Sequence, residues 1–387
     1  MVLQNSLQQR FPFNTIKKLL SVGVDKEILA DNINGKLIVT LNRPRALNAL
    51  NLNMVRKLYP MLKRFNNNPN VPFILIKGAG GKAFCAGGDV IAVSRSARAN
   101  DPSNTIYKDF FREEYAMNHL IGVLKIPYIA IMDGITMGGG CGLCLHGKYR
   151  IATERTILSM PETAIGLFPD VGGTFFLSRL PYSLGQFMAL TGYRVTGADA
   201  YHIGLATHFV PSEKLKDLEE ELLSLDNKLF SAGKIDSILY KYHTKEGELP
   251  KFSLEERLAQ IDYIFSSKTV ESIFKKLRNE DDFGKKQFGI LLKKSPISLK
   301  VTLRQLQIGL KMRFPEVFAM EYRLSQHFMK NHDFHEGCRA ILIDKDQKPK
   351  WKPSSIEEVT DEMTDEYFAP LPEDEELVIS ESKPQNW

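Results

Sequence analysis

The chain has 387 residues, of which 43% are hydrophobic and 25% charged, a composition typical of a globular protein with room for one large domain or two to three smaller ones. No run of about 18 apolar residues occurs, which argues against a membrane-spanning helix. The sequence also has no dense run of basic residues with interleaved aromatic residues, which argues against nucleic acid binding. The net charge of +5 is unevenly distributed: residues 356–387 carry eleven acids and one base, which leaves a net charge of +15 on the rest of the chain. These bases either lie scattered on solvated helix faces or attract the phosphates of a ligand.

The first thirty residues form an expected N-terminal extension. Its first acid is Asp25, and Arg10, Lys17 and Lys18 are interspersed with apolar residues. An amphipathic start that is poor in acids fits a mitochondrial presequence or its remnant, and it fits an ordinary helix or tail equally well. No secretory signal is visible, and the last three residues do not form a peroxisomal address.

Predicted strands and helices alternate up to residue 210. Leu37, Val39 and Leu41 alternate with other residues and should share one face of a strand. Pro60 should kink or divide the helix that follows. The predicted elements are a strand at 35–41, a helix at 55–65, a buried strand at 73–76, a helix at 112–123, a buried strand at 128–132, a helix from a glycine turn to 145, and a strand at 157–160. Strand, glycine turn and helix in succession predict an α/β domain with active loops at strand ends.

Beyond residue 210 the pattern becomes mostly helical and charged. Apolar residues three and four positions apart predict helices at 215–225, 254–265, 270–277 and 315–329. We therefore expect an α/β core at 31–210, a helical C-terminal region at 211–355, and an acidic tail at 356–387 with few anchors to the rest.

Two glycine-rich turns follow predicted strands. Gly87 and Gly88 lie in GGKAFCAGGDV, and the glycines of MGGGCG precede a predicted helix. Amides at the start of a helix lack intrahelical partners and favour negative charge, so one amide from each turn could hold an oxyanion. Tight turns with close strand–helix packing are the alternative. Neither turn spells GxGxxG, and no GxxxxGK[ST] loop exists, so we expect no dinucleotide or nucleoside triphosphate site.

Acidic residues occur among apolar ones in MPETAIGLFPDVGG. Glu162 and Asp170 each follow a proline there, and acids beside apolar walls have the perturbed pKa values that suit acid–base or nucleophilic chemistry. A helix cap and a turn residue are the alternatives. Glu113 and Glu114 are adjacent on a predicted helix, so only one of them can face inward.

Cysteine and histidine patterns indicate no metal or thiol chemistry. Four cysteines do not make a disulfide framework, and the CxxC formed by Cys141 and Cys144 has no second pair to complete a zinc site. The eight histidines show no HExxH or other ligand spacing. Cys141 stands at a helix start, which can activate a thiolate, but no cysteine–histidine arrangement is legible.

Taken together, AFCAGGD, GITMGGGCGL and MPETAIGLFPDVGG resemble the crotonase (enoyl-CoA hydratase/isomerase) superfamily, and within it most closely the subgroup that hydrolyses 3-hydroxyisobutyryl-CoA. The similarity runs from about Asp31 to Pro353. It includes LNRPRALNALNLNM, FFREEY, LTGYR, MEYRLSQ and the closing HDFHEGCRAILIDKDQKPKWKP. The resemblance implies a crotonase-like α/β fold of repeated ββα units, followed by a helical C-terminal region that covers the CoA site.

The resemblance also implies roles for particular residues. The backbone amides of Gly88 and Gly139 would hold the thioester oxygen, and Glu162 is a catalytic position of the superfamily. Asp170 matches the PDVGG motif of the hydrolase subgroup as a further catalytic residue, and Glu114 matches a substrate-contacting position. Gly139, Glu114, Glu162 and Asp170 would accordingly contact the substrate.

Gly142 lies where hydratases of this superfamily carry a second catalytic glutamate, which argues against water addition to an enoyl thioester. We therefore expect an acyl-CoA thioester hydrolase that converts 3-hydroxyisobutyryl-CoA to 3-hydroxyisobutyrate and CoA in valine breakdown. Glu162 would either attack the carbonyl or activate water. The alternatives are a hydratase or isomerase on the same fold and, from another class, a non-catalytic CoA-binding protein.

The expected surroundings follow from the same resemblance. No metal or redox cofactor is expected, because CoA arrives as part of the substrate. The expected partner is a small acyl-CoA substrate, and neither a nucleic acid nor a membrane is expected. The sequence leaves open whether the chain forms a homo-oligomer. A mitochondrial location is expected, with the cytoplasm or the peroxisome as alternatives.

Overall fold

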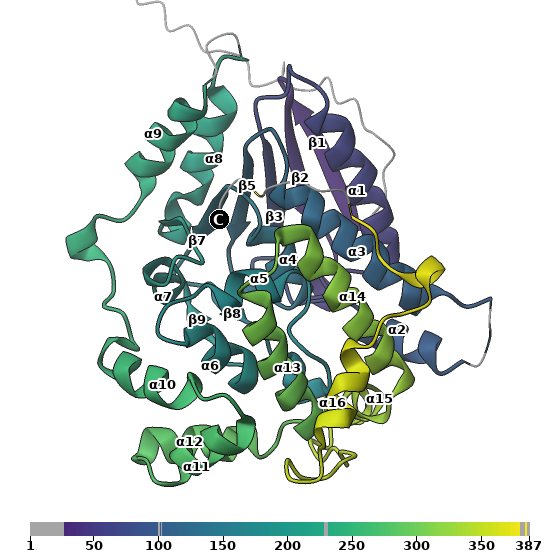
Figure 1. Ribbon diagram of the computed structural model, residues 1–387. Coiled ribbons are helices and arrows are strands. Elements are labelled where there is room, and N and C mark those ends of the chain that lie inside the picture. Colours follow the sequence, from purple (N-terminus) through teal and green to yellow (C-terminus); the bar gives the residue numbers. More distant parts are fainter. Residues whose placement is uncertain (1–26, 100, 102, 228–230, 380–383, 385–387) are drawn as a thin grey trace, which may run out of the picture.

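The computed structural model describes residues 27–387 apart from 100, 102, 228–230, 380–383 and 385–387. The predicted extension at 1–30 therefore lies outside the described residues except for its last four. Two sheets form the upper part of the molecule in Figure 1, with helices on both sides, and the C-terminal helices extend below them. Within the described ranges, no helix is long and apolar enough to cross a membrane.

The strands form two sheets. They are β1 (Ile28–Ile33), β2 (Lys36–Leu41), β3 (Ile74–Gly78), β4 (Ala83–Cys85), β5 (Tyr128–Met132), β6 (Ile135–Met137), β7 (Tyr149–Ala152), β8 (Ile157–Ser159), β9 (Val195–Thr196) and β10 (His208–Phe209). The larger sheet has the order β1-β2-β3-β5-β7-β10, and the smaller one β4-β6-β8-β9. Only β1 and β9 pair antiparallel to their neighbours among these strands.

The strands come in sequential pairs, one in each sheet. β3 and β4, β5 and β6, and β7 and β8 each place their first strand in the larger sheet and their second in the smaller one. A helical segment follows each pair, namely α2 (Val90–Ala97), α4 (Gly139–Cys144) and η2 (Glu162–Ile165). This arrangement confirms the predicted α/β class with repeated ββα units.

The larger sheet packs against a hydrophobic core on each of its two faces. Alternate side chains of each strand point to opposite faces and so enter different cores. Leu37, Val39 and Leu41 join the core that contains α1 (Leu52–Asn66) and α3 (Ile106–Gly122), which confirms their shared face. Ile38 points into a second core. That core is closed by α8 and α9, which lie on the opposite side of the sheet from α1 and α3 in Figure 1.

The remaining helices come after β8 in the chain. They are α5 (Gly173–Ser178), α6 (Leu184–Thr191), α7 (Gly197–His202), α8 (Leu215–Ser224), α9 (Ala232–Tyr242), α10 (Leu258–Phe265), α11 (Val270–Arg278), α12 (Asp282–Leu291), α13 (Pro296–Gly309), α14 (Phe314–Lys330), α15 (His332–Gly337) and α16 (Asp361–Phe368). Single helical turns are η1 (Pro44–Ala46), η3 (Ser212–Lys214), η5 (Glu246–Glu248), η6 (Glu255–Arg257), the π-helix η7 (Cys338–Ile343) and η8 (Glu373–Glu375). The predicted helices at 215–225, 270–277 and 315–329 are confirmed as α8, α11 and α14, and the one predicted at 254–265 consists of η6 followed by α10. The predicted domain boundaries stay a prediction.

Pro60 does not divide its helix, contrary to one of the two effects predicted for it. α1 runs unbroken through Pro60, whose side chain lies on the exposed face. Water can therefore satisfy the carbonyl that proline leaves without a donor. Met54, Val55 and Leu58 on the opposite face are fully buried and keep the helix packed on the core.

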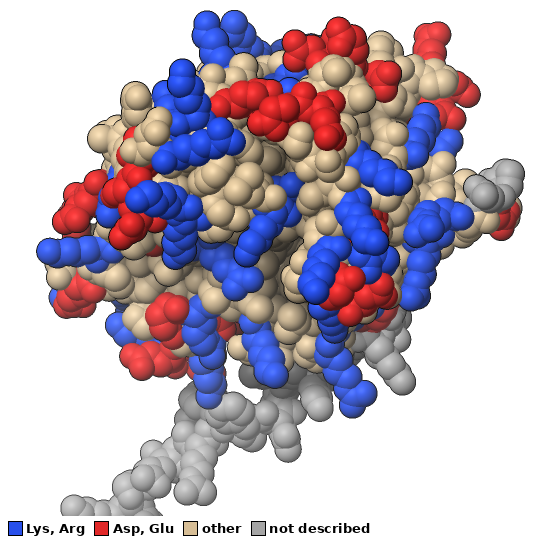
Figure 2. Space-filling view, turned by 90° about the horizontal axis from the view of Figure 1, so that it is seen from below, with Lys and Arg blue, Asp and Glu red and all other residues tan. Residues whose placement is uncertain are grey.

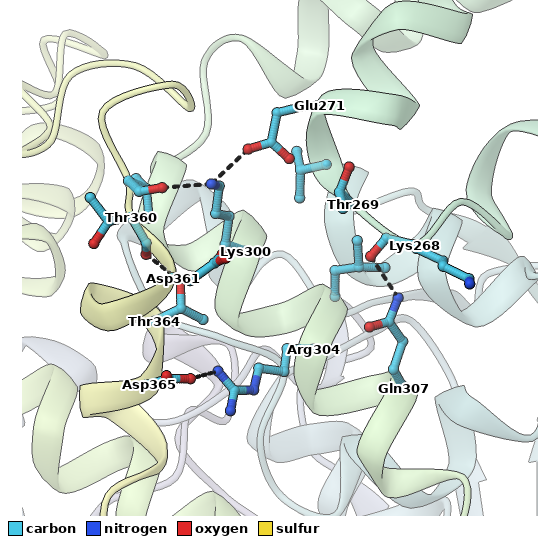
Figure 3. Close-up of a pocket in the computed structure, with 13 residues that line it drawn as sticks. Lys268, Thr269, Glu271, Lys300, Arg304, Gln307, Thr360, Asp361, Thr364 and Asp365 are labelled. Atoms are coloured by element: carbon cyan, nitrogen blue, oxygen red, sulfur yellow. Dashed lines mark hydrogen bonds and ion pairs between the residues drawn. The ribbon is translucent and has the colours of Figure 1, made fainter.

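The acidic tail is anchored, and the expectation of few anchors was wrong. Tyr367, Leu371 and Leu377 are buried. Arg323 on α14 binds Glu376 through two hydrogen bonds of 2.7 and 2.9 Å, and Arg304 pairs with Asp365 (Figure 3). The acids of the tail thus lie against bases of the helical region, and its sparse apolar residues add burial that net charge alone does not reveal.

Candidate active site

Three predicted site residues lie at one edge of the smaller sheet. β4, β6 and β8 are parallel neighbours, so their carboxyl ends lie side by side. Gly88 follows the end of β4 by three residues, Gly139 follows β6 by two, and Glu162 follows β8 by three. The ββα repeat therefore brings residues from three separate motifs to one place.

The two glycine turns border the same space. A Cβ atom built on Gly139 would lie 3.3 Å from the amide nitrogen of Gly88. Neither amide donates to a backbone carbonyl in the turns and loops of the described chain, and Gly139 is the first residue of α4, where amides lack intrahelical partners. Gly140 must lack a side chain, because its Cβ would lie 2.2 Å from the Cys85 carbonyl oxygen.

Two carboxyl groups flank the second glycine turn. A Cβ on Gly139 would lie 2.6 Å from Oε1 of Glu114, and one on Gly138 would lie 2.7 Å from Oε1 of Glu162. Glu114 is only 1% exposed, whereas the Glu113 side chain is 33% exposed and pairs with Arg56 at 2.7 Å. The prediction that one acid of the pair faces inward is confirmed, and the inward one is Glu114.

Asp170 completes a group of three buried acids. It is 6% exposed, and its Oδ2 accepts a 2.9 Å hydrogen bond from the hydroxyl of Tyr115. Tyr115 follows Glu114 on α3. Helix α3 thus contributes a carboxyl group to the site and orients a second one from another loop.

A buried glutamate of α14 holds the loop that carries Asp170. Oε2 of Glu321 accepts from the amide of Gly172 at 2.7 Å, and Oε1 accepts from the amide of Thr174 at 2.9 Å. Between Asp170 and Gly172, Val171 adopts φ +55°, which a β-branched residue rarely does. Such a conformation costs on the order of 1–3 kcal/mol and persists only where the surroundings impose it. The carboxylate of Glu321 is part of what imposes it.

The three acids resist ionisation. Burial, then the charges of Asp170 and Glu162, raise the pKa of Glu114 well above its usual value. Burial and the charge of Asp170 raise the pKa of Glu162 in the same way, with Lys294 opposing. Burial raises the pKa of Asp170 to about 7, although the Tyr115 hydrogen bond opposes it. Groups whose pKa lies near neutrality can exchange protons during a reaction.

Buried oxygens of this group have no hydrogen-bond partner in the described structure. They are Oε1 of Glu114 and Oε2 of Glu162. A buried polar atom left unpaired costs about 1–3 kcal/mol. A site that carries this cost twice is arranged for a ligand rather than for stability.

A cavity rich in lysine adjoins η2. It has a volume of about 750 Å³, is lined by Ala164 of η2, and includes Lys293, Lys294, Lys348 and Lys350 with no acidic residue. Burial lowers the pKa of Lys294 to about 8, and the charge of Glu162 opposes this shift. Lys and Arg side chains are numerous on the face in Figure 2. An anionic ligand could approach Glu162 through the cavity that contains the four lysines.

A second cavity, of about 780 Å³, lies between α11, α13 and α16 (Figure 3). Its charges are neutralised internally: Lys300 lies 2.6 Å from Glu271 and donates to the Val359 carbonyl at 2.5 Å, and Arg304 pairs with Asp365. None of the predicted site residues lines it.

The thiol of Cys141, near the start of α4, is not activated. Burial raises the pKa of Cys141 well above its usual value, which keeps the thiol protonated. No cluster of three or more potential metal ligands occurs among the residues that the structure describes.

Sequence reasoning missed Tyr115, Asn118 and Glu321 at the site. Glu321 had a detectable signal, because it shares a helix face with the apolar residues Phe318 and Leu324, and an acid on such a face must have partners. Asn118 lies four residues after Glu114 and so on the same face of α3.

Known proteins resemble this chain over most of its length. The sequence profile described as enoyl-CoA hydratase/isomerase matches residues 36–368. Mitochondrial 3-hydroxyisobutyryl-CoA hydrolases are 51% identical in Rattus norvegicus and in Homo sapiens, each over 89% of both chains, and 48% identical in Gallus gallus over 93% of this chain and 95% of that one.

Solved structures share the fold. A carnitinyl-CoA dehydratase from Mycobacterium thermoresistibile superposes with a TM-score of 0.83 at 36% identity, over 92% of this chain and 99% of that one. An enoyl-CoA hydratase from Rhodobacter sphaeroides gives 0.82 at 34% identity, over 91% and 100%.

Proposed function

The chain belongs to the enoyl-CoA hydratase/isomerase family, and we propose that it hydrolyses the thioester of 3-hydroxyisobutyryl-CoA, giving 3-hydroxyisobutyrate and CoA. Relatives about 50% identical over about 90% of the chain carry that activity in their names. Their names also support a mitochondrial location, and the predicted role in valine breakdown fits the named reaction. The observation that carries the proposal is the group of three buried carboxyls beside two adjacent glycine turns.

The glycine amides stabilise the charge that develops on the thioester oxygen. As water or a carboxylate attacks the carbonyl carbon, its oxygen becomes an oxyanion, and the amides of Gly88 and Gly139 donate to it. Each such donor contributes about 3 kcal/mol to the transition state. The amides are fixed by the strand ends before substrate binds, so little reorganisation is needed.

Glu162 supplies the attacking group by one of two routes. Its carboxylate attacks the carbonyl and forms an anhydride that water then cleaves, or it removes a proton from water that attacks directly. In either route the carbon–sulfur bond breaks and the CoA thiolate takes up a proton. The charge of Asp170 raises the pKa of Glu162, and such an interaction is mutual, so the two acids share a proton more readily than they both ionise. When Glu162 carries the negative charge, Asp170 holds the proton and can donate it or orient the acyl hydroxyl. Glu114 orients the hydroxyl end.

No protein-bound cofactor takes part in this scheme, since CoA belongs to the substrate. The cavity lined by four lysines beside η2 would attract its phosphates. The proposal requires neither a nucleic acid nor a membrane, and it holds for a monomer or a homo-oligomer.

Water addition to an enoyl thioester is the second candidate on this fold. Gly142 argues against it, because a Cβ there would lie 2.7 Å from the Cβ of Val171 and 2.8 Å from Nδ2 of Asn118. A glutamate side chain at 142 has no room. Hydration of crotonyl-CoA by the wild-type protein would favour this candidate. A CoA-binding protein without activity is the third, and it would release no thiol from any acyl-CoA.

The experiment is thiol release from 3-hydroxyisobutyryl-CoA by the wild type and by Glu162→Gln. The variant should lose turnover by orders of magnitude and still bind the thioester. Glu113→Gln, which changes the partly exposed neighbouring acid that pairs with Arg56, is the matched control and should stay active. Near-normal turnover by Glu162→Gln would rule the mechanism out. In a single turnover in ¹⁸O water, label in the Glu162 carboxylate supports the anhydride, and its absence supports direct attack by water.

A further inference from the structure

Asn118 carries a fully buried side-chain amide that has no hydrogen-bond partner in the part of the chain that the structure describes. It is 0% exposed, and neither Nδ2 nor Oδ1 forms a hydrogen bond with any part of the described chain. Asn48 is equally buried, and it donates to the carbonyls of Ala79 and Ala83 at 2.9 and 2.8 Å and accepts from the amide of Arg43 at 2.9 Å. Two asparagines of equal burial thus differ completely in their hydrogen bonding.

An unpaired buried amide has no benefit for folding. More than 90% of buried polar groups in proteins are paired, and each exception calls for an explanation. An apolar residue of the same shape would avoid the cost of stripping water from the amide. Asn118 is therefore suited to a hydrogen-bond partner that comes from solution.

Asn118 lies in the group of residues that forms the candidate active site. It shares a face of α3 with Glu114, one turn away, whose Oε1 is also unpaired. A Cβ built on Gly142 would lie 2.8 Å from its Nδ2 and 2.7 Å from the Cβ of Val171, the residue after Asp170. The missing side chain at 142 thus leaves its space to the amide of Asn118.

We propose that Asn118 hydrogen-bonds the hydroxyl group of the 3-hydroxyacyl substrate and selects for it, an inference that rests on the proposed function. A hydroxyl both donates and accepts, and an amide offers both functions in return. A neutral amide adds no fourth charge to Glu114, Glu162 and Asp170. A substrate without the hydroxyl would leave the amide buried and unpaired, which is how sites built for a hydroxyl reject analogues that lack one.

The test compares kcat/KM for 3-hydroxyisobutyryl-CoA and isobutyryl-CoA, which differ only in the hydroxyl. Asn118→Leu keeps the shape and removes both hydrogen-bonding functions. The ratio of the two kcat/KM values should fall about 10- to 100-fold, as expected for the loss of one buried hydrogen-bonding group. The fall should come from loss on the hydroxylated substrate, and the melting temperature should not fall. Asn118→Ala is measured in the same way if the leucine variant does not fold.

Asn48→Leu is the matched control, because it removes a buried amide that is fully paired. It should lower the melting temperature and leave the substrate ratio unchanged. An unchanged ratio in Asn118→Leu, with or without equal losses on both substrates, would overturn this inference and leave the proposed function standing. A wild type that cleaves neither thioester would overturn the proposed function and this inference together.

Discussion

Replacing Asp170 by asparagine should stabilise the protein increasingly as the pH rises. Burial raises the pKa of Asp170 from 3.8 to about 7 in the folded chain. Between these values the folded chain holds a proton that the unfolded chain has released. The free energy of unfolding of the wild type therefore falls as the pH rises through this window. Asparagine carries no titrating group and removes this dependence.

The magnitude follows from the two pKa values. Their difference of about three corresponds to about 4 kcal/mol of unfolding free energy, lost from about pH 4 and fully lost above about pH 7. Asparagine has the same shape and can still accept from the Tyr115 hydroxyl. The exchange also removes the negative charge that raises the pKa values of Glu114 and Glu162. This second effect likewise makes the variant more stable than the wild type as the pH rises.

Urea unfolding of the wild type and of Asp170→Asn at pH 5, 6, 7 and 8 measures this effect. The difference in unfolding free energy should widen in favour of the variant by about 3 kcal/mol from pH 5 to pH 8. The same exchange at Asp217, an exposed acid on α8, reports what loss of a solvated charge does. A difference that is constant with pH, or that narrows, would refute the reasoning, because Asp170 would then ionise freely in the folded chain. Thiol release should be impaired in the stabilised variant.

Three further changes test other parts of the structure. Gly139→Ala should lower kcat about 100- to 1000-fold in the thiol-release assay, because its methyl group would enter the space between the Gly88 amide and Glu114. Gly289→Ala, where a methyl group meets nothing within 4 Å, should stay active, and an equal loss of activity in both variants would count against a shared oxyanion site. In Glu321→Gln, the backbone amide of Gly172 or of Thr174 faces the side-chain NH₂ group instead of an oxygen, so kcat should fall more than KM changes. Glu321→Asp should restore part of the lost kcat. An unaltered kcat in Glu321→Gln would show that Glu321 of α14 does not position the Asp170 loop for catalysis. Deletion of residues 356–387 should lower the melting temperature by exposing the surface under its buried aromatic and leucine side chains, and an unchanged melting temperature would show that these contacts contribute nothing.

Local patterns predicted part of the strands and helices and left several of both unpredicted. The alternation at 37–41, the apolar runs of β3 and β5 and the helical spacing of α8, α11 and α14 each reflect a periodicity within a few residues of chain. Pro60 shows the limit of such reasoning, because its effect depended on which face of α1 the core would cover. β1 was not predicted, and it forms only by pairing with β2.

The site residues also divide into those that the sequence predicted and those whose arrangement only the tertiary structure decided. The sequence by itself singled out Gly88, Gly139, Glu162, Asp170 and Glu114, because glycine turns and acids beside apolar residues are visible locally and their order resembles a known superfamily. Only the tertiary structure decided that the ends of β4, β6 and β8 bring three of them together. It also decided that Glu114 rather than Glu113 points inward. Glu321 holds the Asp170 loop through the amide of Gly172, 149 residues earlier, and the Asn118 side chain has no hydrogen-bond partner among the described residues. These outcomes depend on how strands and helices distant in sequence pack, and no local pattern records which buried polar group will meet which.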